Sequence, residues 1–301
     1  MKSKGSSPRR TQRARRKTKA KTNVGRTKIK GQVNDKKKNS PVIGVFDSGV
    51  GGLTVLRELV RQIPCADYLY FGDTARLPYG SKSAETVARY AISSAQYLQQ
   101  NGAEHLVIAC NTASALALGA IAKAVDVSVL GVIEPGAEQA SAVSKSRKAV
   151  VIATEGTVSS HAYKRALSAR GVAAEEKACP LFVPLVEEGW LEHSVTEQVA
   201  HEYLDGLFAG EFANADALVL GCTHYPLLKP LLRKVVPQQV AIVDSAESTA
   251  AALAKKLGLK DGGSQPKVEF FATDSVEKFR RAGEKFMGRK IENVKHVELE
   301  S

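Results

Sequence analysis

The chain of 301 residues carries a formal net charge of +12, and that charge is concentrated at one end. Residues 1–40 contain 16 Lys and Arg against one acidic residue, whereas the remainder contains 27 basic and 30 acidic residues. Four cysteines exclude a disulfide framework, and the absence of a secretory h-region or an apolar run long enough to span a bilayer predicts a cytoplasmic protein with reduced thiols.

The basic segment, residues 1–40, contains only six apolar residues. Because so few side chains cannot bury a core against the entropy of ordering the chain, we expect this segment to be disordered. A flexible basic arm binds polyanions by releasing counterions, so one hypothesis is a contact with nucleic acid or another acidic partner. The alternative is a solvated extension without a specific role.

From residue 42 onwards, short apolar β-branched runs alternate with helical patterns, which predicts an α/β protein with parallel strands. The clearest helices are residues 53–63 and 83–100, the second followed by the helix breaker Gly102. Right-handed crossovers bring the carboxyl ends of all strands to one edge of each sheet, where ligands usually bind. The predicted strands are residues 42–46, 68–71, 105–109, 127–132, 149–153, 217–221 and 240–243.

A weak internal repeat runs through these elements. VIGVFDSG (42–49) precedes Cys110, and VVIATEGT (150–157) precedes Cys222 at a similar spacing, with Thr154 in the place of Asp47. The repeat predicts two similar, doubly wound parallel-sheet lobes related by pseudo-symmetry, with the active site in the cleft between them. The expected division is a basic tail at 1–40, a first lobe at 41–133 plus 244–301, and a second lobe at 134–243.

Cys110 and Cys222 each follow an apolar strand and precede a polar turn. A thiol that opens a helix lies in the positive field of the helix N-terminus, which favours thiolate and predicts a pKa below the usual value of about 8.5. Either cysteine alone is typical of a small buried apolar residue. The matched pair instead indicates a functional centre, whereas Cys65 and Cys179 lack this setting and are interpreted as structural.

Three kinds of functional site could use the two thiols: a metal site, a Cys–His nucleophile and a two-base proton-transfer site. A metal site built from Cys110, Cys222 and His224 is disfavoured because an i, i+2 pair in a turn chelates poorly and no CxxC supports it. A Cys–His nucleophile needs only one thiol and leaves the second unexplained. Two-base proton transfer, in which one sulfur removes a proton from a carbon and the other returns one to the opposite face, uses both and amounts to racemisation or epimerisation.

The residues beside the thiols suit a small anionic or zwitterionic substrate, because hydroxyl, amide and backbone donors can hold a carboxylate without arginine. Asp47 is a candidate for binding an ammonium group or orienting a thiol, and equally for capping a turn. His224 is a candidate general acid or base. The glycine-rich DSGVGG (47–52) matches neither GxGxxG nor the Walker pattern, so a nucleotide cofactor is unsupported.

Seven motifs in order across residues 42–258 resemble those of the glutamate racemases, cofactor-independent enzymes of the aspartate/glutamate racemase superfamily. The motifs are IGVFDSGVGGLTVL (43–56), YFGDTARLPYGSKS (70–83), IACNTASA (108–115), VIEPG (132–136), CPLFVPLVEEG (179–189), GCTHYPLL (221–228) and VDSA (243–246).

The resemblance implies interconversion of L- and D-glutamate by a bacterial enzyme that supplies D-glutamate for peptidoglycan, with no cofactor and no metal. It implies that Cys110 deprotonates D-glutamate and Cys222 deprotonates L-glutamate, assisted by Asp47, His224 and Glu187. The implied substrate contacts are Asp47, Ser48, Tyr79, Gly80, Asn111, Thr112, Thr223 and His224.

The alternatives are a related aspartate racemase, which the histidine after CT disfavours, and a protein that binds nucleic acid or gyrase through the basic tail. Some relatives in the resembled family restrain DNA gyrase, and the tail itself departs from the family pattern. A homodimer is left open by the sequence, and no membrane contact is expected.

Overall fold

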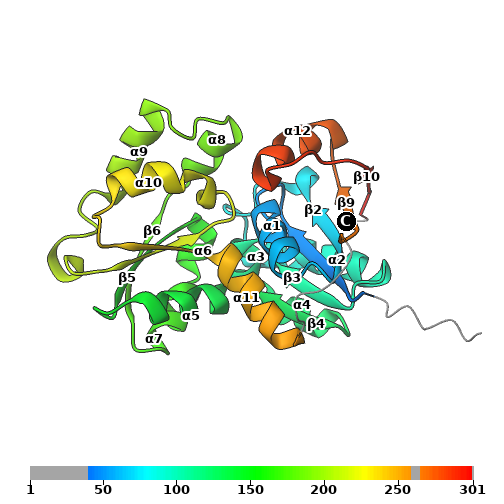
Figure 1. The fold of residues 1–301 in the computed structure, drawn as a ribbon, viewed down its shortest axis with the longest axis horizontal. Helices are drawn as coiled ribbons and strands as arrows, with labels where there is room; N and C mark the ends of the chain where they lie inside the picture. The colour runs from blue at the N-terminus through cyan, green and yellow to red at the C-terminus, as the bar shows by residue number, and fades with distance from the viewer. Residues whose placement is uncertain (1–39, 259–264, 300–301) are drawn as a thin grey trace, which may run out of the picture. The chain divides into compact units, whose positions relative to one another are not determined.

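The computed structural model describes residues 40–258 and 265–299. The predicted disordered tail, apart from Ser40, lies outside these described residues. Within them the chain forms two parallel sheets (Figure 1).

The larger sheet has six strands in the order β10-β9-β2-β1-β3-β4, and every neighbouring pair is parallel. The central strand β1 pairs with β2 on one side and β3 on the other, so the direction of the winding reverses at β1. The strands are β1 (Val42–Asp47), β2 (Asp67–Gly72), β3 (His105–Ile108), β4 (Ser128–Gly131), β9 (Val268–Ala272) and β10 (Val294–His296).

The smaller sheet has four parallel strands in the order β6-β5-β7-β8. Its first strand again lies between the second and third, as in β2-β1-β3-β4 of the larger sheet. This repeated order confirms the predicted α/β fold class of two similar parallel-sheet lobes. The strands are β5 (Lys148–Ala153), β6 (Ala173–Ala178), β7 (Ala217–Gly221) and β8 (Ala241–Asp244).

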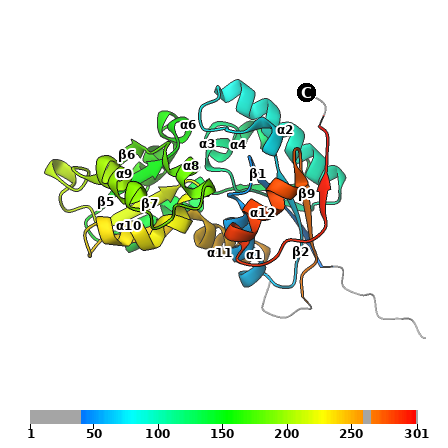
Figure 2. The same cartoon turned by 90° about the horizontal axis from the view of Figure 1, so that it is seen from above.

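Helices cover both faces of each sheet. In Figure 1 α5 to α10 lie with the smaller sheet, α1 to α4 and α12 lie with the larger one, and α11 lies between them. Figure 2 shows the same division for the helices that it labels. The helices are α1 (Leu53–Gln62), α2 (Ala84–Gln100), α3 (Asn111–Leu116), α4 (Leu118–Ala124), α5 (Ile133–Val143), α6 (Glu155–Ser159), α7 (Ala162–Ser168), α8 (Phe182–Glu187), α9 (Ser194–Leu204), α10 (Lys229–Val235), α11 (Ser245–Leu257) and α12 (Val276–Met287).

The apolar core is continuous from one sheet to the other. Its largest cluster joins Val45 of β1 and Ile152 of β5 through side chains of α11 such as Ala250 and Leu253. Helix α11 packs on both α1 and α5. Two further clusters fill the remaining face of each sheet. The lobes are therefore joined by burial of apolar surface as well as by the chain itself.

All seven predicted strands are present, and no end differs from the prediction by more than one residue. Three strands were not predicted: β6, β9 and β10. The predicted lobe boundaries fall at the beginning of α5 and at the last residue of β8, and the boundaries themselves stay a prediction. No helix within residues 40–258 and 265–299 is long and apolar enough to cross a membrane.

Candidate active site

A cavity of about 390 Å³ lies where the carboxyl ends of β1 and β3 face those of β5 and β7. Both ends are points at which strand order reverses, the usual ligand position in open parallel sheets. The volume lies at the small end of the range for ligand pockets, which suits a small molecule rather than a dinucleotide. The lining residues are Ser48, Leu77, Pro78, Tyr79, Gly80, Ser81, Cys110, Asn111, Thr112, Thr154, Glu155, Pro180, Val183, Pro184, Glu187, Cys222, Thr223 and His224.

The first thiol, Cys110, caps α3: its Sγ accepts a hydrogen bond from Ala113 N at 3.5 Å and donates one to Ser48 Oγ at 3.6 Å. The side chain is buried at the wall of the cavity. Burial, reinforced by the charge of Asp47, raises the pKa of the Cys110 thiol to about 12. The prediction of a lowered pKa is therefore wrong for Cys110, because desolvation outweighs the N–H groups of a six-residue helix.

Asp47 ends β1 and is fully buried. Its Oδ2 accepts a hydrogen bond from Gly49 N at 3.0 Å, while Oδ1 has no partner within the described part of the chain. Burial raises the pKa of this carboxyl, and the charge of His224 opposes the shift only in part. A Cβ at Gly52 would lie 2.5 Å from Asp47 Cβ, so only glycine lets the chain turn over the carboxylate.

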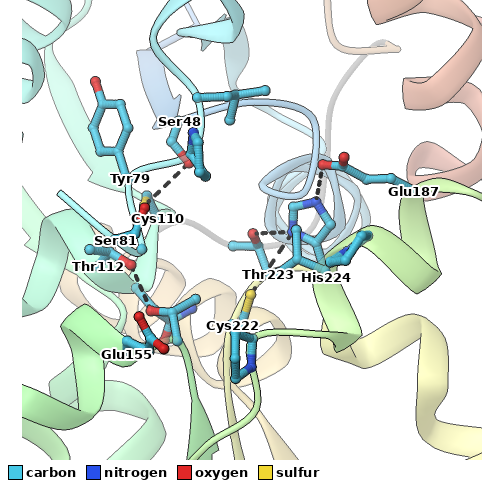
Figure 3. Close-up of a pocket in the computed structure, with 18 residues that line it drawn as sticks. Ser48, Tyr79, Ser81, Cys110, Thr112, Glu155, Glu187, Cys222, Thr223 and His224 are labelled. Carbon is cyan, nitrogen blue, oxygen red and sulfur yellow. Dashed lines mark hydrogen bonds and ion pairs between the residues drawn. The ribbon is translucent and has the colours of Figure 1, made fainter. Parts of the chain in front are cut away.

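The second thiol, Cys222, follows β7 and faces His224. Its Sγ lies 3.9 Å from His224 Nδ1, and the other ring nitrogen, Nε2, lies 3.0 Å from Glu187 Oε1 (Figure 3). Burial alone lowers the pKa of His224, but hydrogen bonds to Cys222 and Glu187 more than offset it and raise the pKa to about 10. The imidazole is therefore protonated at neutral pH and places a cation beside Cys222 Sγ.

The glycine-rich turn after β1 packs against this second thiol segment. A Cβ at Gly51 would lie 2.3 Å from Thr223 Oγ1 and 2.5 Å from His224 Nδ1. Thr54 Oγ1 also donates a hydrogen bond to the Thr223 carbonyl at 3.2 Å. Gly51 of DSGVGG therefore serves close contact between the two lobes, in keeping with the absence of a phosphate-binding pattern.

Hydroxyl groups connect the lobes on the other side of the cavity. Thr112 Oγ1, at the beginning of α3, lies 2.9 Å from Thr154 Oγ1, which in turn lies 2.9 Å from Thr157 Oγ1 in α6. The backbone of Gly156 donates to the Gly80 carbonyl at 2.8 Å. These contacts hold α6 against the segment that carries Cys110.

The structure places the predicted site residues at this cavity with the exception of Asp47, which is buried and is not a lining residue. Tyr79 lines the cavity, but its hydroxyl is directed away from it and donates to Asp73 Oδ2 at 2.5 Å. A substrate contact at Tyr79 would therefore use the ring or the backbone. Cys65 and Cys179 do not line the cavity, and no group of three or more potential metal ligands occurs among the described residues.

Several lining residues were not predicted. Thr154 and Glu155 come from the turn after β5, and the internal repeat, which aligns Thr154 with Asp47, is the signal that could have identified them. Ser81 and the apolar wall had no comparable signal, because isolated Leu, Val and Pro residues fit any core or loop. No Lys or Arg occurs among the described lining residues, so a bound carboxylate would depend on hydroxyl, amide and N–H donors. The apolar wall consists of Leu77, Pro78, Pro180, Val183 and Pro184.

Comparison with known proteins identifies one family. Residues 43–253 match the model of the Asp/Glu/Hydantoin racemase family. The glutamate racemase of Koribacter versatilis is 59% identical over 284 residues, covering 86% of this chain and 98% of that protein. These matches confirm the resemblance inferred from the seven motifs, and with it an amino-acid racemase as the class of enzyme.

Comparison with solved structures also finds glutamate racemases. The glutamate racemase isoform RacE1 of Bacillus anthracis is 39% identical, with a TM-score of 0.80 over 86% of this chain and 98% of that one. The glutamate racemase of Francisella tularensis, solved in complex with D-glutamate, is 35% identical with a TM-score of 0.78 over the same shares.

Proposed function

Because the chain belongs to the Asp/Glu/Hydantoin racemase family, we propose that it interconverts L- and D-glutamate by moving the α-proton between two cysteines without a cofactor. The observation that carries the proposal is the position of Cys110 and Cys222, which follow equivalent strands of two similar sheets and line one cavity (Figure 3). Thiols that reach one small molecule from two lobes can act on opposite faces of its α-carbon.

The chemical difficulty is that the α-hydrogen of an amino acid is only weakly acidic. A carbanion at this carbon needs nearby donors that are fixed before the reaction begins, and an environment from which water is excluded. The apolar wall supports water exclusion, and the carboxylates of the substrate would accept hydrogen bonds from Ser48, Asn111, Thr112 and Thr223. Movement of one lobe relative to the other would open and close such a site.

The protonation states around the two thiols favour opposite roles, with one sulfur as proton donor and the other as proton acceptor. Cys110 holds a proton, since its pKa is about 12, and Cys222 faces a protonated His224. In the L-to-D direction Cys222 thiolate removes the α-proton of L-glutamate, and the Cys110 S–H bond breaks to protonate the opposite face. Cys110 is then the thiolate and Cys222 the thiol, which is the state that begins the D-to-L direction.

Glutamate rather than aspartate is the proposed substrate because relatives that are 59% and 48% identical are named glutamate racemase, and because a histidine follows Cys222-Thr223. The proposed product, D-glutamate, would supply peptidoglycan synthesis in a bacterial cytoplasm. A decisive test is incubation of the purified protein with L-glutamate in heavy water without pyridoxal phosphate. We expect D-glutamate that carries α-deuterium; if neither product nor label forms, the proposal is wrong.

A second role is proposed for residues 1–40, whose 16 basic residues against one acid favour binding to nucleic acid or another polyanion. Deletion of residues 1–38 should abolish retention on immobilised DNA at low salt and leave racemisation unchanged. Equal retention of the full and the shortened chain would remove the tail from consideration.

A further inference from the structure

Tyr163 connects the two thiol segments although it does not line the cavity. It belongs to α7 of the second lobe and is fully buried. Its hydroxyl donates a hydrogen bond of 2.7 Å to Oδ1 of Asn111, the residue after Cys110 at the beginning of α3 in the first lobe. Burial raises the pKa of this phenol well above its usual value, so the hydroxyl keeps the proton that it donates.

Two glycines fix the ring in place. A Cβ at Gly221, the residue before Cys222, would lie 3.0 Å from Tyr163 Cε2. A Cβ at Gly136 in α5 would lie 3.2 Å from Cε1 and 3.3 Å from the hydroxyl oxygen. The ring is therefore packed between α5 and the end of β7, and its hydroxyl position depends on the segment that carries the second thiol.

The hydrogen bond determines which end of the Asn111 amide remains available. Oδ1 is occupied by Tyr163, while Nδ2 is buried and has no partner within residues 40–258 and 265–299. An unpaired buried donor is costly, and an acceptor on a bound molecule would relieve that cost. Asn111 lines a cavity whose described walls contain no Lys or Arg, so each remaining donor counts for binding a carboxylate.

We propose that Tyr163 is a positioning residue that holds the Asn111 amide with Nδ2 as the donor to a carboxylate of the substrate. This inference rests on the proposed function. It differs from a purely structural role for Tyr163, in which the ring would fill space between the lobes and the hydroxyl would matter only for stability. In our account the hydroxyl acts on substrate binding through Asn111 alone.

The test is a double-mutant cycle of Tyr163→Phe and Asn111→Ala, with KM and kcat measured for both enantiomers. The phenylalanine keeps the ring and removes only the donor. We expect KM to rise roughly two- to tenfold, the worth of an ordinary hydrogen bond, with kcat changed less than KM. In the Asn111→Ala background, Tyr163→Phe should change KM by less than about twofold, since coupled residues are not additive.

The matched control is Tyr68→Phe, which removes another buried hydroxyl that donates to the carbonyls of Leu59 and Ile63 away from the cavity. It should lower the melting temperature without changing KM. If Tyr163→Phe proves too unstable to purify, Gly136→Ala provides a milder change, because it crowds the same hydroxyl while favouring the helix. We expect Gly136→Ala to raise KM in the wild-type background and to leave KM unchanged in the Asn111→Ala background.

An unchanged KM in Tyr163→Phe, or effects of the two substitutions that multiply, would overturn the inference while leaving the racemase proposal intact. A wild-type protein that neither racemises glutamate nor binds either enantiomer by calorimetry would instead refute the proposed function, and this inference with it.

Discussion

His224 Nε2 lies 3.0 Å from Glu187 Oε1, so the histidine that faces Cys222 is held on its far side by a carboxylate from α8. The carboxylate orients the ring and favours its protonated form. Glu187 is the outer member of the contact, since its side chain is 40% exposed whereas that of His224 is 8% exposed. The pair therefore couples the protonation of His224, which lies beside Cys222, to the partly exposed carboxylate of Glu187.

Glu187→Gln should shift the alkaline limb of the pH profile. The pKa of His224 is raised to about 10, so the imidazolium persists until the pH approaches that value and is lost above it. Removing one of the groups that raise this pKa moves the loss to lower pH. We expect log kcat/KM to fall at lower pH in the variant than in the wild type. The ammonium of glutamate also titrates in this range, but it affects both enzymes equally.

The same substitution must lower kcat/KM equally in both directions, because L- and D-glutamate have the same free energy. Any asymmetry between the two thiol sides can appear only in the separate values of kcat and KM. An alkaline limb at the same pH in both enzymes would show that Glu187 does not control the protonation of His224.

The two thiols should be separable by isotope exchange. Cys110→Ser and Cys222→Ser are each expected to lower racemisation by several orders of magnitude, since a serine hydroxyl is a far weaker acid than a thiol and its basic alkoxide form is not populated near neutral pH. In heavy water Cys222→Ser should still exchange the α-hydrogen of D-glutamate with retention, and Cys110→Ser that of L-glutamate. NMR after chiral separation measures both; the opposite preference would reverse the assigned roles.

The fold could be predicted largely because buried parallel strands are short apolar runs. ALVLG at residues 217–221 corresponds to β7 residue for residue, and every position in it is buried. Strand β6, AAEEKA, was missed because it lies at the edge of its sheet, with exposed first and third positions and a part-buried second half. Its formation depends on pairing with β5, which the local sequence does not encode.

The candidate site was predictable to the extent that motifs mark strand ends. Cys110 and Cys222 were found from pattern alone, but the environment that determines their protonation was not. The raised pKa of Cys110 depends on burial by residues distant in the sequence and on Asp47, 63 positions earlier. Tyr163 had no signal at all, since one tyrosine in a helix looks like any core residue until its hydroxyl meets Asn111.

Gly51→Ala should damage activity more than stability. The added Cβ would meet Thr223 Oγ1 and His224 Nδ1 at distances that atoms do not tolerate, so the turn or the histidine must move. A displacement of about 1 Å at reacting groups can cost on the order of 100-fold in rate, and we expect a loss of kcat/KM of about that size. Gly119→Ala, at a position with no neighbour within 4 Å, is the matched control and should keep full activity.

Asp47→Asn should stabilise the protein at neutral pH while lowering its activity. The pKa of Asp47 is raised in the folded state, so folding binds its proton more tightly, and the free energy of unfolding falls as the pH rises above the ordinary value of 3.8. An amide of the same shape avoids that loss. We therefore expect a higher melting temperature than wild type at pH 7.5, and a difference that shrinks as the pH approaches 4.

The effect of Asp47→Asn on activity can be followed separately through the pKa of the Cys110 thiol. The charge of Asp47 contributes to the raised pKa of Cys110, so the asparagine should lower that pKa from about 12. Thiolate absorbance in a background that keeps Cys110 as the single cysteine (Cys65→Ala, Cys179→Ala and Cys222→Ser), compared with and without Asp47→Asn, measures the shift. A melting temperature below that of wild type at pH 7.5, together with an unmoved Cys110 titration, would mean that Asp47 serves the turn through its bond to Gly49 rather than the thiol.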